Sequence, residues 1–400
     1  MGRPSYGWFV VAASFVNLFM VYGIVFSIGL YFKPMMEEFA WTRTELSLGV
    51  SLFMLAFGFS QPVMGRLIDR YGPKTVLSLS IALMSLGVVL SGQIRSLPGY
   101  YLAFGLLAGL GYSGAGALAN AVVVSRWFSE RRGLALGVSS AGTNLGQLVL
   151  FPVTMYLILS QGWRASFTVM GLLLLVLALP LVLLLVKDRP PEERVIGGLD
   201  PREPPEERFT ILEAARTRSF WLLFLGFFVC GFTAHGVFVH FPLYAIELGM
   251  GEMAVANLLG LIGGVSILGV LVVGSISDRL GRRIPLAATY ALRSISLFWL
   301  LGARDTASLT VFVALFGFSY FATVPLVSGC VADIYGKASM GSILGFIWFS
   351  HAMGQAVGPY LAGLAFDTSH SYATAFQASA FLLLMAAGAS LFVQERYRSP

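Results

Sequence analysis

The histidines of this chain are the side chains best suited to carry a proton within its apolar stretches. His235 and His240 share one apolar segment, His351 lies near the middle of another, and His370 falls in a short polar segment where we expect it to be solvated. An imidazole changes its charge near neutral pH. A helix turns by about 100° per residue, so His235 and His240 lie on different faces. We expect His240, His235 and His351 to be site residues, with helix–helix hydrogen bonding as the alternative role.

Arg293 is the one charged side chain deep within an apolar segment. Burying an arginine in a bilayer costs on the order of 3 kcal/mol on insertion scales, so a partner or a function is expected. A guanidinium can bind a carboxylate through two parallel hydrogen bonds. We therefore expect contact with an anion at Arg293; the alternative is that its side chain extends toward the membrane surface.

Uncharged polar side chains near the middle of other apolar segments are further candidate contacts for a ligand. Their commoner role in membrane helices is to hydrogen-bond neighbouring helices, and this alternative stays open. These residues are Tyr22, Asn120, Asn144, Gln147, Tyr320 and Gln355.

The sequence contains no Walker motif, no metal-ligand cluster and no nucleophile elbow. We therefore expect no enzyme activity, no catalytic residues, no metal and no cofactor. Gly109–Gly114 fits the dinucleotide pattern G-x-G-x-x-G, but it lies in an apolar segment, follows no strand and has no acidic partner about 20 residues on. Close helix packing is the better interpretation of these glycines.

The composition predicts a membrane protein: 57% of the 400 residues are hydrophobic and 12% are charged. A soluble protein of this size carries about a quarter charged residues. The net charge of +6 comes from basic residues in short loops between apolar runs, a pattern of membrane topology rather than of nucleic-acid binding. Cys230 and Cys330 lie in apolar segments without paired spacing and are expected to be small core residues.

Twelve apolar segments are long enough to cross a bilayer, which needs about 20 residues per helix. The first, Trp8–Phe32, lacks a cleavage site and is expected to be a retained helix. We predict an all-α membrane fold of two six-helix halves with pseudo-twofold symmetry, residues 1–186 and 219–400, joined by a proline-rich, charged cytoplasmic linker at 187–218. The spans fall at 8–32, 46–64, 75–94, 99–125, 134–160, 165–186, 219–244, 254–277, 284–303, 308–332, 339–366 and 372–394.

The distribution of basic residues predicts that both termini are cytoplasmic, because inner loops of membrane proteins are enriched in Lys and Arg. Five basic residues fall on the outer side: Lys33, Arg43, Arg95, Arg164 and Arg304. Thirteen fall on the inner side: Arg3, Arg66, Arg70, Lys74, Arg126, Arg131, Arg132, Arg279, Arg282, Arg283, Lys337, Arg396 and Arg398.

One charged segment occurs twice, each time after the second span of a half. Gly65-Arg-Leu-Ile-Asp-Arg-Tyr-Gly-Pro-Lys74 is repeated as Gly274-Ser-Ile-Ser-Asp-Arg-Leu-Gly-Arg-Arg283. Each first glycine permits close approach of a neighbouring helix, and each aspartate can pair with an arginine or cap a helix N-terminus. We expect a cytoplasmic gate formed by Gly65, Asp69, Arg70, Gly274, Asp278 and Arg279.

These repeated segments resemble the signature loop of the major facilitator superfamily. A second motif, Arg126-Trp-Phe-Ser-Glu-Arg-Arg-Gly-Leu-Ala-Leu-Gly137, is similar to the entry of the fifth helix in the monocarboxylate and oxalate–formate porter families. Tyr6-Gly-Trp8 and Phe39-Ala-Trp-Thr-Arg43 are also similar to those families, as is His240 beside Phe241-Pro242. The resemblance implies transport of small organic anions, often with a proton, through a cavity lined by helices that carry the polar residues named above.

One departure weakens the anion assignment. The monocarboxylate family carries a substrate-binding arginine in its eighth helix, whereas 257–277 here contains no charge. We predict a monomeric, multi-pass secondary transporter of the cell (inner) membrane that moves a small monocarboxylate or related organic anion by alternating access, with protons as coupling ion in symport. An exporter of hydrophobic or amphipathic compounds is the alternative, and a transport-incompetent sensor with the same fold is a third.

Overall fold

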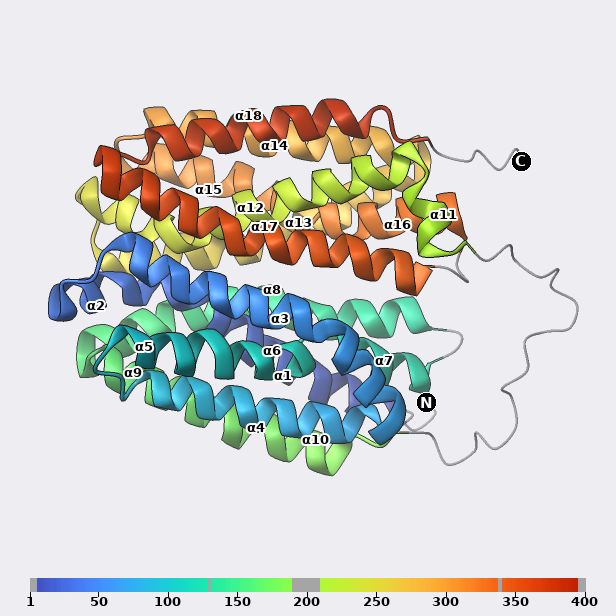
Figure 1. Ribbon diagram of the computed structural model, residues 1–400, viewed down its shortest axis with the longest axis horizontal. Helices are drawn as coiled ribbons and strands as arrows, with labels where there is room; N and C mark the ends of the chain where they lie inside the picture. The colour runs from blue at the N-terminus through green and yellow to red at the C-terminus, as the bar shows by residue number, and fades with distance from the viewer. Residues whose placement is uncertain (1–5, 129–130, 189–208, 337–339, 395–400) are drawn as a thin grey trace, which may run out of the picture. The chain divides into compact units, whose positions relative to one another are not determined.

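A computed structural model of the chain describes residues 6–128, 131–188, 209–336 and 340–394 (Figure 1). Most of the predicted linker lies outside the described residues, as do both copies of Pro-Pro-Glu-Glu-Arg at 190–194 and 204–208. The inner-side basic residues Arg3, Lys337, Arg396 and Arg398 lie outside them as well. The described part is helical and contains no β-strand.

Six long helical segments form the first part of the chain. Three of them contain a short 3₁₀ or π segment, so they carry several labels. They are α1 Gly7–Phe26 continued by Ser27–Tyr31 and α2 Phe32–Phe39; α3 Arg43–Tyr71; α4 Pro73–Ser91; α5 Leu97–Tyr100 continued by Tyr101–Ala108, α6 Gly109–Ala115 and α7 Ala117–Trp127; α8 Arg132–Gln161; and α9 Trp163–Leu173 continued by Leu174–Ala178 and α10 Leu179–Leu185.

Six more long segments follow the short helix α11. The fourth of them breaks into two helices after Tyr320. They are α12 Arg218–Glu247, α13 Glu252–Leu280, α14 Arg283–Gly302, α15 Thr306–Tyr320 with α16 Thr323–Tyr335, α17 Met340–Ser369 and α18 Ala373–Ser390, while α11 covers Ile211–Ala215.

Eleven of the twelve segments in the described part are long and apolar enough to span a membrane. The twelfth, α17, has 30 residues, but Ser350, His351, Gln355 and several glycines make it less apolar. The all-α, twelve-helix prediction is confirmed, and the chain is a multi-pass membrane protein. Several helices extend beyond their apolar spans; α3 runs from Arg43 to Tyr71 around the span predicted at 46–64, because a helix continues past the hydrocarbon layer where charged side chains meet water.

Contacts within the chain divide it into two compact units. Unit 1 comprises residues 1–195 and 238–264, and unit 2 comprises 196–237 and 265–400. The first unit therefore includes the C-terminal part of α12 and the N-terminal part of α13. The half boundaries at 186 and 219 stay a prediction.

The same glycine-mediated packing occurs in both units. In unit 1, a Cβ atom on Gly142 or Gly146 of α8 would collide with the carbonyl oxygens of Phe15 and Phe19 in α1. In unit 2, a Cβ atom on Gly354 or Gly358 of α17 would collide with the carbonyl oxygens of Phe228 and Phe232 in α12. Small residues four apart let helix backbones approach closely, which is how many membrane helices associate. The two parts of the chain therefore share this mode of helix packing as well as the repeated charged segment.

A second glycine of each repeated segment has a backbone role. Gly72 and Gly281, the eighth residues of the two copies, end α3 and α13 with φ angles of +83° and +75°. Side chains other than glycine rarely adopt this conformation. The recurrence of glycine at this position thus follows from the sharp turn between the second and third spans of each half.

The structure also confirms the packing role of Gly109–Gly114. The segment lies in helix α6, where a Cβ atom on Gly109, Gly111 or Gly114 would crowd atoms of α3 or α4.

Candidate functional site

His240 lies in the part of α12 that belongs to unit 1. Its side chain is fully buried, and its Nε2 atom is 3.1 Å from the hydroxyl oxygen of Ser47 in α3. The ring also meets Phe32 of α2 edge to face, with centroids 6.0 Å apart. The imidazole therefore sits where two helices from the first part of the chain meet the seventh span.

An ion-pair cluster in unit 1 joins α2 and α3 to the end of α12 and the start of α13. It consists of Lys33, Arg43, Glu247 and Glu252. Arg43 pairs with Glu247, and Lys33 pairs with Glu252. The capping box between Thr42 and Glu45 fixes the first turn of α3, which starts at Arg43. The side chain of Arg43 is only 8% exposed, so its pairing matters more than that of a solvated arginine.

Sequence reasoning placed Lys33 and Arg43 among the outer basic residues and missed both pairs. The partners are 219 and 204 residues apart along the chain, so no local pattern connects them. The available signal was that an acidic residue lies near each end of the loop between the seventh and eighth spans.

Asn144 and Gln147 lie where α8 crosses α13. A Cβ atom on Gly263 of α13 would lie 2.7 Å from the backbone oxygen of Asn144 and 2.8 Å from the Cβ of Gln147. Gln147 is fully buried, and neither its amide nitrogen nor its amide oxygen has a hydrogen-bond partner among the described residues; the same holds for the side-chain oxygen of Asn144. Buried amides normally have partners, so these atoms are suited to bind a polar ligand.

Tyr22 and Asn120, the other predicted site residues of the first half, contact neighbouring helices. Asn120 donates to the carbonyl oxygens of Ala115 and Gly116 at the break between α6 and α7, and Asn17 of α1 donates to the oxygen of Ala115 as well. The ring of Tyr22 meets that of Tyr112 at 5.6 Å between centroids. Tyr22 thus contributes to the contact of α1 with the fourth span, and Asn120 bonds the backbone at the break within that span.

Arg293 of α14 is fully buried in unit 2. One terminal nitrogen donates to the sulfur of Cys230 at 3.1 Å, and the other donates to the carbonyl oxygens of Ser319 and of Tyr320, the latter at 2.6 Å. Arg293 therefore binds the backbone at the break between α15 and α16. Its contact with an anion stays a prediction.

The remaining histidines of the predicted site lie in unit 2. His351 of α17 stacks on Phe227, and its Nδ1 atom lies 3.0 Å from the carbonyl oxygen of that residue. His235 of α12 lies with its Nδ1 atom 3.4 Å from the amide nitrogen of Gln355. The two imidazoles join α12 to α17, which is the helix–helix role that the sequence left open for them.

The four charged residues of the predicted gate are exposed near the ends of α3 and α13, while Gly65 and Gly274 are half-buried. Asp69 and Arg70 form no ion pair with any residue that the structure describes, while Asp278 lies 4.0 Å from Arg282. A Cβ atom on Gly65 or Gly274 would meet no atom of the described residues within 4 Å. The gating role of these six residues stays a prediction.

Carboxylates outside the repeated segments bind these turns. The Asp188 carboxylate accepts the backbone N–H of Lys74 at 2.8 Å and lies against Gly72. In the second copy, Nε of Arg282 donates to Asp333 of α16 at 3.0 Å. Asp188 and Asp333 were not predicted from the sequence, because neither belongs to the repeat.

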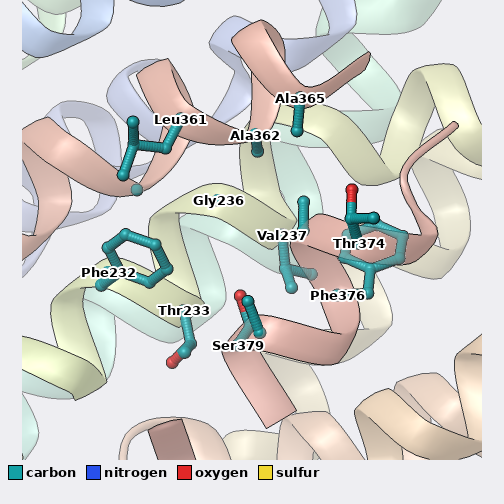
Figure 2. Close-up of a pocket in the computed structure, with 13 residues that line it drawn as sticks. Phe232, Thr233, Gly236, Val237, Leu361, Ala362, Ala365, Thr374, Phe376 and Ser379 are labelled. Carbon is teal, nitrogen blue, oxygen red and sulfur yellow. The ribbon is translucent and has the colours of Figure 1, made fainter. Parts of the chain in front are cut away.

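A cavity of about 190 Å³ in unit 2 lies between α12, α17 and α18 (Figure 2). Its lining is mostly hydrocarbon, from residues such as Phe232, Val237 and Leu361, with the hydroxyls of Thr233 and Ser379 nearby. None of the predicted site residues lines it. The cavity is therefore suited to an apolar group rather than to an anion.

The family of the chain follows from comparison of its sequence with known families. The model of the Major Facilitator Superfamily matches residues 11–359, which is most of the chain. The chain belongs to the Major Facilitator Superfamily. The resemblance drawn from the repeated charged segments is thereby confirmed.

Several relatives of this superfamily member are similar over nearly its whole length. The MFS-type transporter YcxA of Bacillus subtilis is 28% identical, covering 92% of this chain and 90% of the relative. The oxalate:formate antiporter of Oxalobacter formigenes is 26% identical (98% and 93% covered), and human monocarboxylate transporter 11 is 28% identical (96% and 82% covered).

A solved structure supports the fold. A bacterial homologue of the human lysosomal transporter Spinster, crystallised in an inward-facing and unoccupied conformation, superposes with a TM-score of 0.78 at 16% identity, covering 98% of both chains. The family match and the relatives together identify a transporter rather than an enzyme.

Proposed function

We propose that this protein is a secondary active transporter that moves a small monocarboxylate or related organic anion by alternating access, as a proton symporter. The observation that carries this proposal is the similarity, over more than nine-tenths of the chain, to an oxalate:formate antiporter and to monocarboxylate transporters. Secondary transporters with repeated halves bind their substrate near the middle of the membrane.

The anion-binding residues that we propose are those with donors or buried polar atoms away from the helix ends. The side-chain oxygen of Asn144 and both polar atoms of the Gln147 amide beside it lack partners among the described residues. Arg293 supplies the one deep positive charge, next to Tyr320, and it would replace the arginine that the eighth helix lacks. The other proposed contacts are His240, His235, His351, Asn120 and Tyr22.

The two ends of the transporter would be closed by different contacts. We propose that the ion-pair cluster closes the outer end, because it ties the last turns of α12 and the first turns of α13 to α2 and α3. The repeated charged segments with Asp69 and Asp278 would close the cytoplasmic end. We propose that the protein is a monomer in the inner membrane of the cell. Both of its termini would then lie in the cytoplasm, in accord with the basic residues of the inner loops.

Binding of the anion can be tested before transport. Lactate, pyruvate or oxalate at concentrations well above its dissociation constant should raise the melting temperature of the purified protein, because a ligand that binds only the folded state stabilises it. At a hundredfold excess over Kd the stabilisation is about 2.7 kcal/mol. Chloride at equal ionic strength is the control.

A hydrophobic or amphipathic compound is the alternative cargo, favoured by the apolar cavity of Figure 2 and by the uncharged middle of α13. Stabilisation by a lipophilic cation, together with no response to any of the three anions, would replace the anion proposal by this one.

His240 is the residue that we propose to carry the coupled proton, since the predicted spans contain no Asp or Glu at depth. His240→Ala should keep anion exchange but lose the acceleration of uptake by an inward proton gradient, because alanine cannot be protonated. His370→Asn, at an exposed histidine, is the matched control. Gradient-driven uptake that is unchanged in His240→Ala would show that the proton travels on another group or on the substrate.

A further inference from the structure

The buried arginine of unit 2 lacks an ordinary counter-charge. A guanidinium remains protonated in proteins, and Arg293 has no exposed surface. None of the ion pairs formed by the described residues includes it. Its Nε atom has no hydrogen-bond partner within the same set of residues.

The groups around the guanidinium supply partial charges, which do not neutralise it. Two backbone oxygens accept its hydrogen bonds, and the rings of Phe316 and Tyr320 lie with their centroids 5.8 and 6.0 Å from its Cζ atom. An isolated charge in an apolar interior is costly. A full negative charge next to Arg293 would therefore stabilise this part of the protein.

Cys230 is the acidic group in direct contact with Arg293. Its sulfur lies 3.1 Å from the guanidinium and 3.3 Å from the hydroxyl oxygen of Thr323 in α16. The other titratable groups facing this sulfur are His351 of α17 and Tyr290 of α14. A thiol is a stronger acid than a phenol, so Cys230 is the group that can supply the negative charge.

We propose that Cys230 is a thiolate that forms a buried ion pair with Arg293. The thiolate receives hydrogen bonds from the guanidinium and from Thr323. The neutral thiol would leave the arginine charge uncompensated. The pair describes the protein without a bound anion, in which Cys230 supplies the negative charge at Arg293, and it does not depend on which substrate the protein moves.

The pair also has a structural consequence for the tenth span. Pro325 has no backbone N–H, and the N–H of Val324 donates to Phe321 rather than to Tyr320. Arg293 supplies donors to the oxygens of Ser319 and Tyr320 at this break. Cys230 thus positions the arginine that holds the break between α15 and α16.

Alkylation with iodoacetamide provides a direct test. The electron pair of the thiolate forms an S–C bond, the C–I bond breaks, and iodide leaves; the thiolate reacts, whereas a thiol does not. The chain contains an internal control, because Cys330 of α16 is also a buried cysteine outside any disulfide. Rates at both residues would be measured on the purified full-length protein by peptide mass spectrometry between pH 6 and 8.

A thiolate should react at a rate that changes less than about twofold across this pH range, while the rate of a thiol such as Cys330 should rise about tenfold per pH unit. Arg293→Gln should give Cys230 the same pH dependence as Cys330. Parallel tenfold rises at both cysteines in the wild-type protein would overturn the proposal.

If burial prevents alkylation of both cysteines, the ion pair is tested by thermal unfolding of substituted proteins. Cys230→Val leaves the arginine without its counter-charge and should lower the melting temperature more than Cys330→Val does. The double variant Cys230→Val/Arg293→Met should recover most of this loss, because an apolar pair can replace a buried ion pair without loss of stability. Additive effects of the two substitutions would show that no ion pair exists.

Discussion

Arg43→Glu is expected to lower anion uptake at least tenfold, and adding Glu247→Arg is expected to restore most of it. The single change places two carboxylates together at a site where the native arginine side chain is 8% exposed and Glu247 is 42% exposed. Losing a partner costs about 3–5 kcal/mol for a buried pair and up to about 1 kcal/mol for an exposed one. A cost of about 2 kcal/mol, between these two limits, would shift the equilibrium between open and closed outer ends about 30-fold.

The double variant Arg43→Glu/Glu247→Arg distinguishes the ion pair from any other role of Arg43. Uptake would be measured with labelled anion at matched amounts of protein in the membrane. Arg95→Glu is the matched control, because Arg95 is exposed on the same predicted outer side and forms no ion pair in the part of the chain that the structure describes. A double variant as inactive as Arg43→Glu would refute a gating role for the Arg43–Glu247 contact.

Gly146→Leu is expected to prevent folding of the first unit. Any Cβ atom at this position collides with the backbone oxygen of Phe19, and a backbone oxygen within a helix cannot move aside as a side chain can. Relief of the clash would require α1 and α8 to separate along their whole contact. Overpacking typically costs about 1–3 kcal/mol, and the cost here should exceed that range because backbone must shift.

The same helix offers a control for this substitution. A Cβ atom on Gly137 would meet no atom within 4 Å in the part of the chain that the structure describes, so Gly137→Leu should express and unfold like the wild-type protein. The measurement is the yield of monodisperse protein by size-exclusion chromatography and its melting temperature. Gly354→Leu, the corresponding change in α17 of unit 2, should fail in the same way as Gly146→Leu. Normal yield and stability of Gly146→Leu would show that α1 and α8 do not pack as closely as described.

Most of the fold could be predicted because its signals are local. Twelve apolar segments, the inner basic residues and the repeated charged segment each depend on residues that are close together in the sequence. The predicted ends were less accurate, because hydropathy reports the hydrocarbon layer and not the hydrogen bonds that extend a helix such as α3 to Tyr71. The break after Tyr320 was not predicted at all, although Pro325 is its local signal.

The candidate site was harder to predict because its contacts join distant segments. Arg293 was recognised as a deep charge, but its contact with Cys230 depends on how α14 packs against α12, and the sequence presented that cysteine only as a small core residue. The contact between Ser47 and His240 joins residues that are 193 positions apart in the sequence. Gln147 was one of several polar residues in the sequence, and its burial without a partner becomes visible only once α8 and α13 are placed together.

Uptake of labelled lactate, pyruvate and oxalate into proteoliposomes, with and without an imposed pH gradient, tests most directly that this superfamily member is a proton-coupled anion transporter. We predict that at least one of the three anions enters protein-containing vesicles faster than empty ones, and that an inward proton gradient concentrates it above the external level. Failure of all three anions to enter faster than into empty vesicles, with gradient-driven movement of a lipophilic cation through the same protein, would contradict the account.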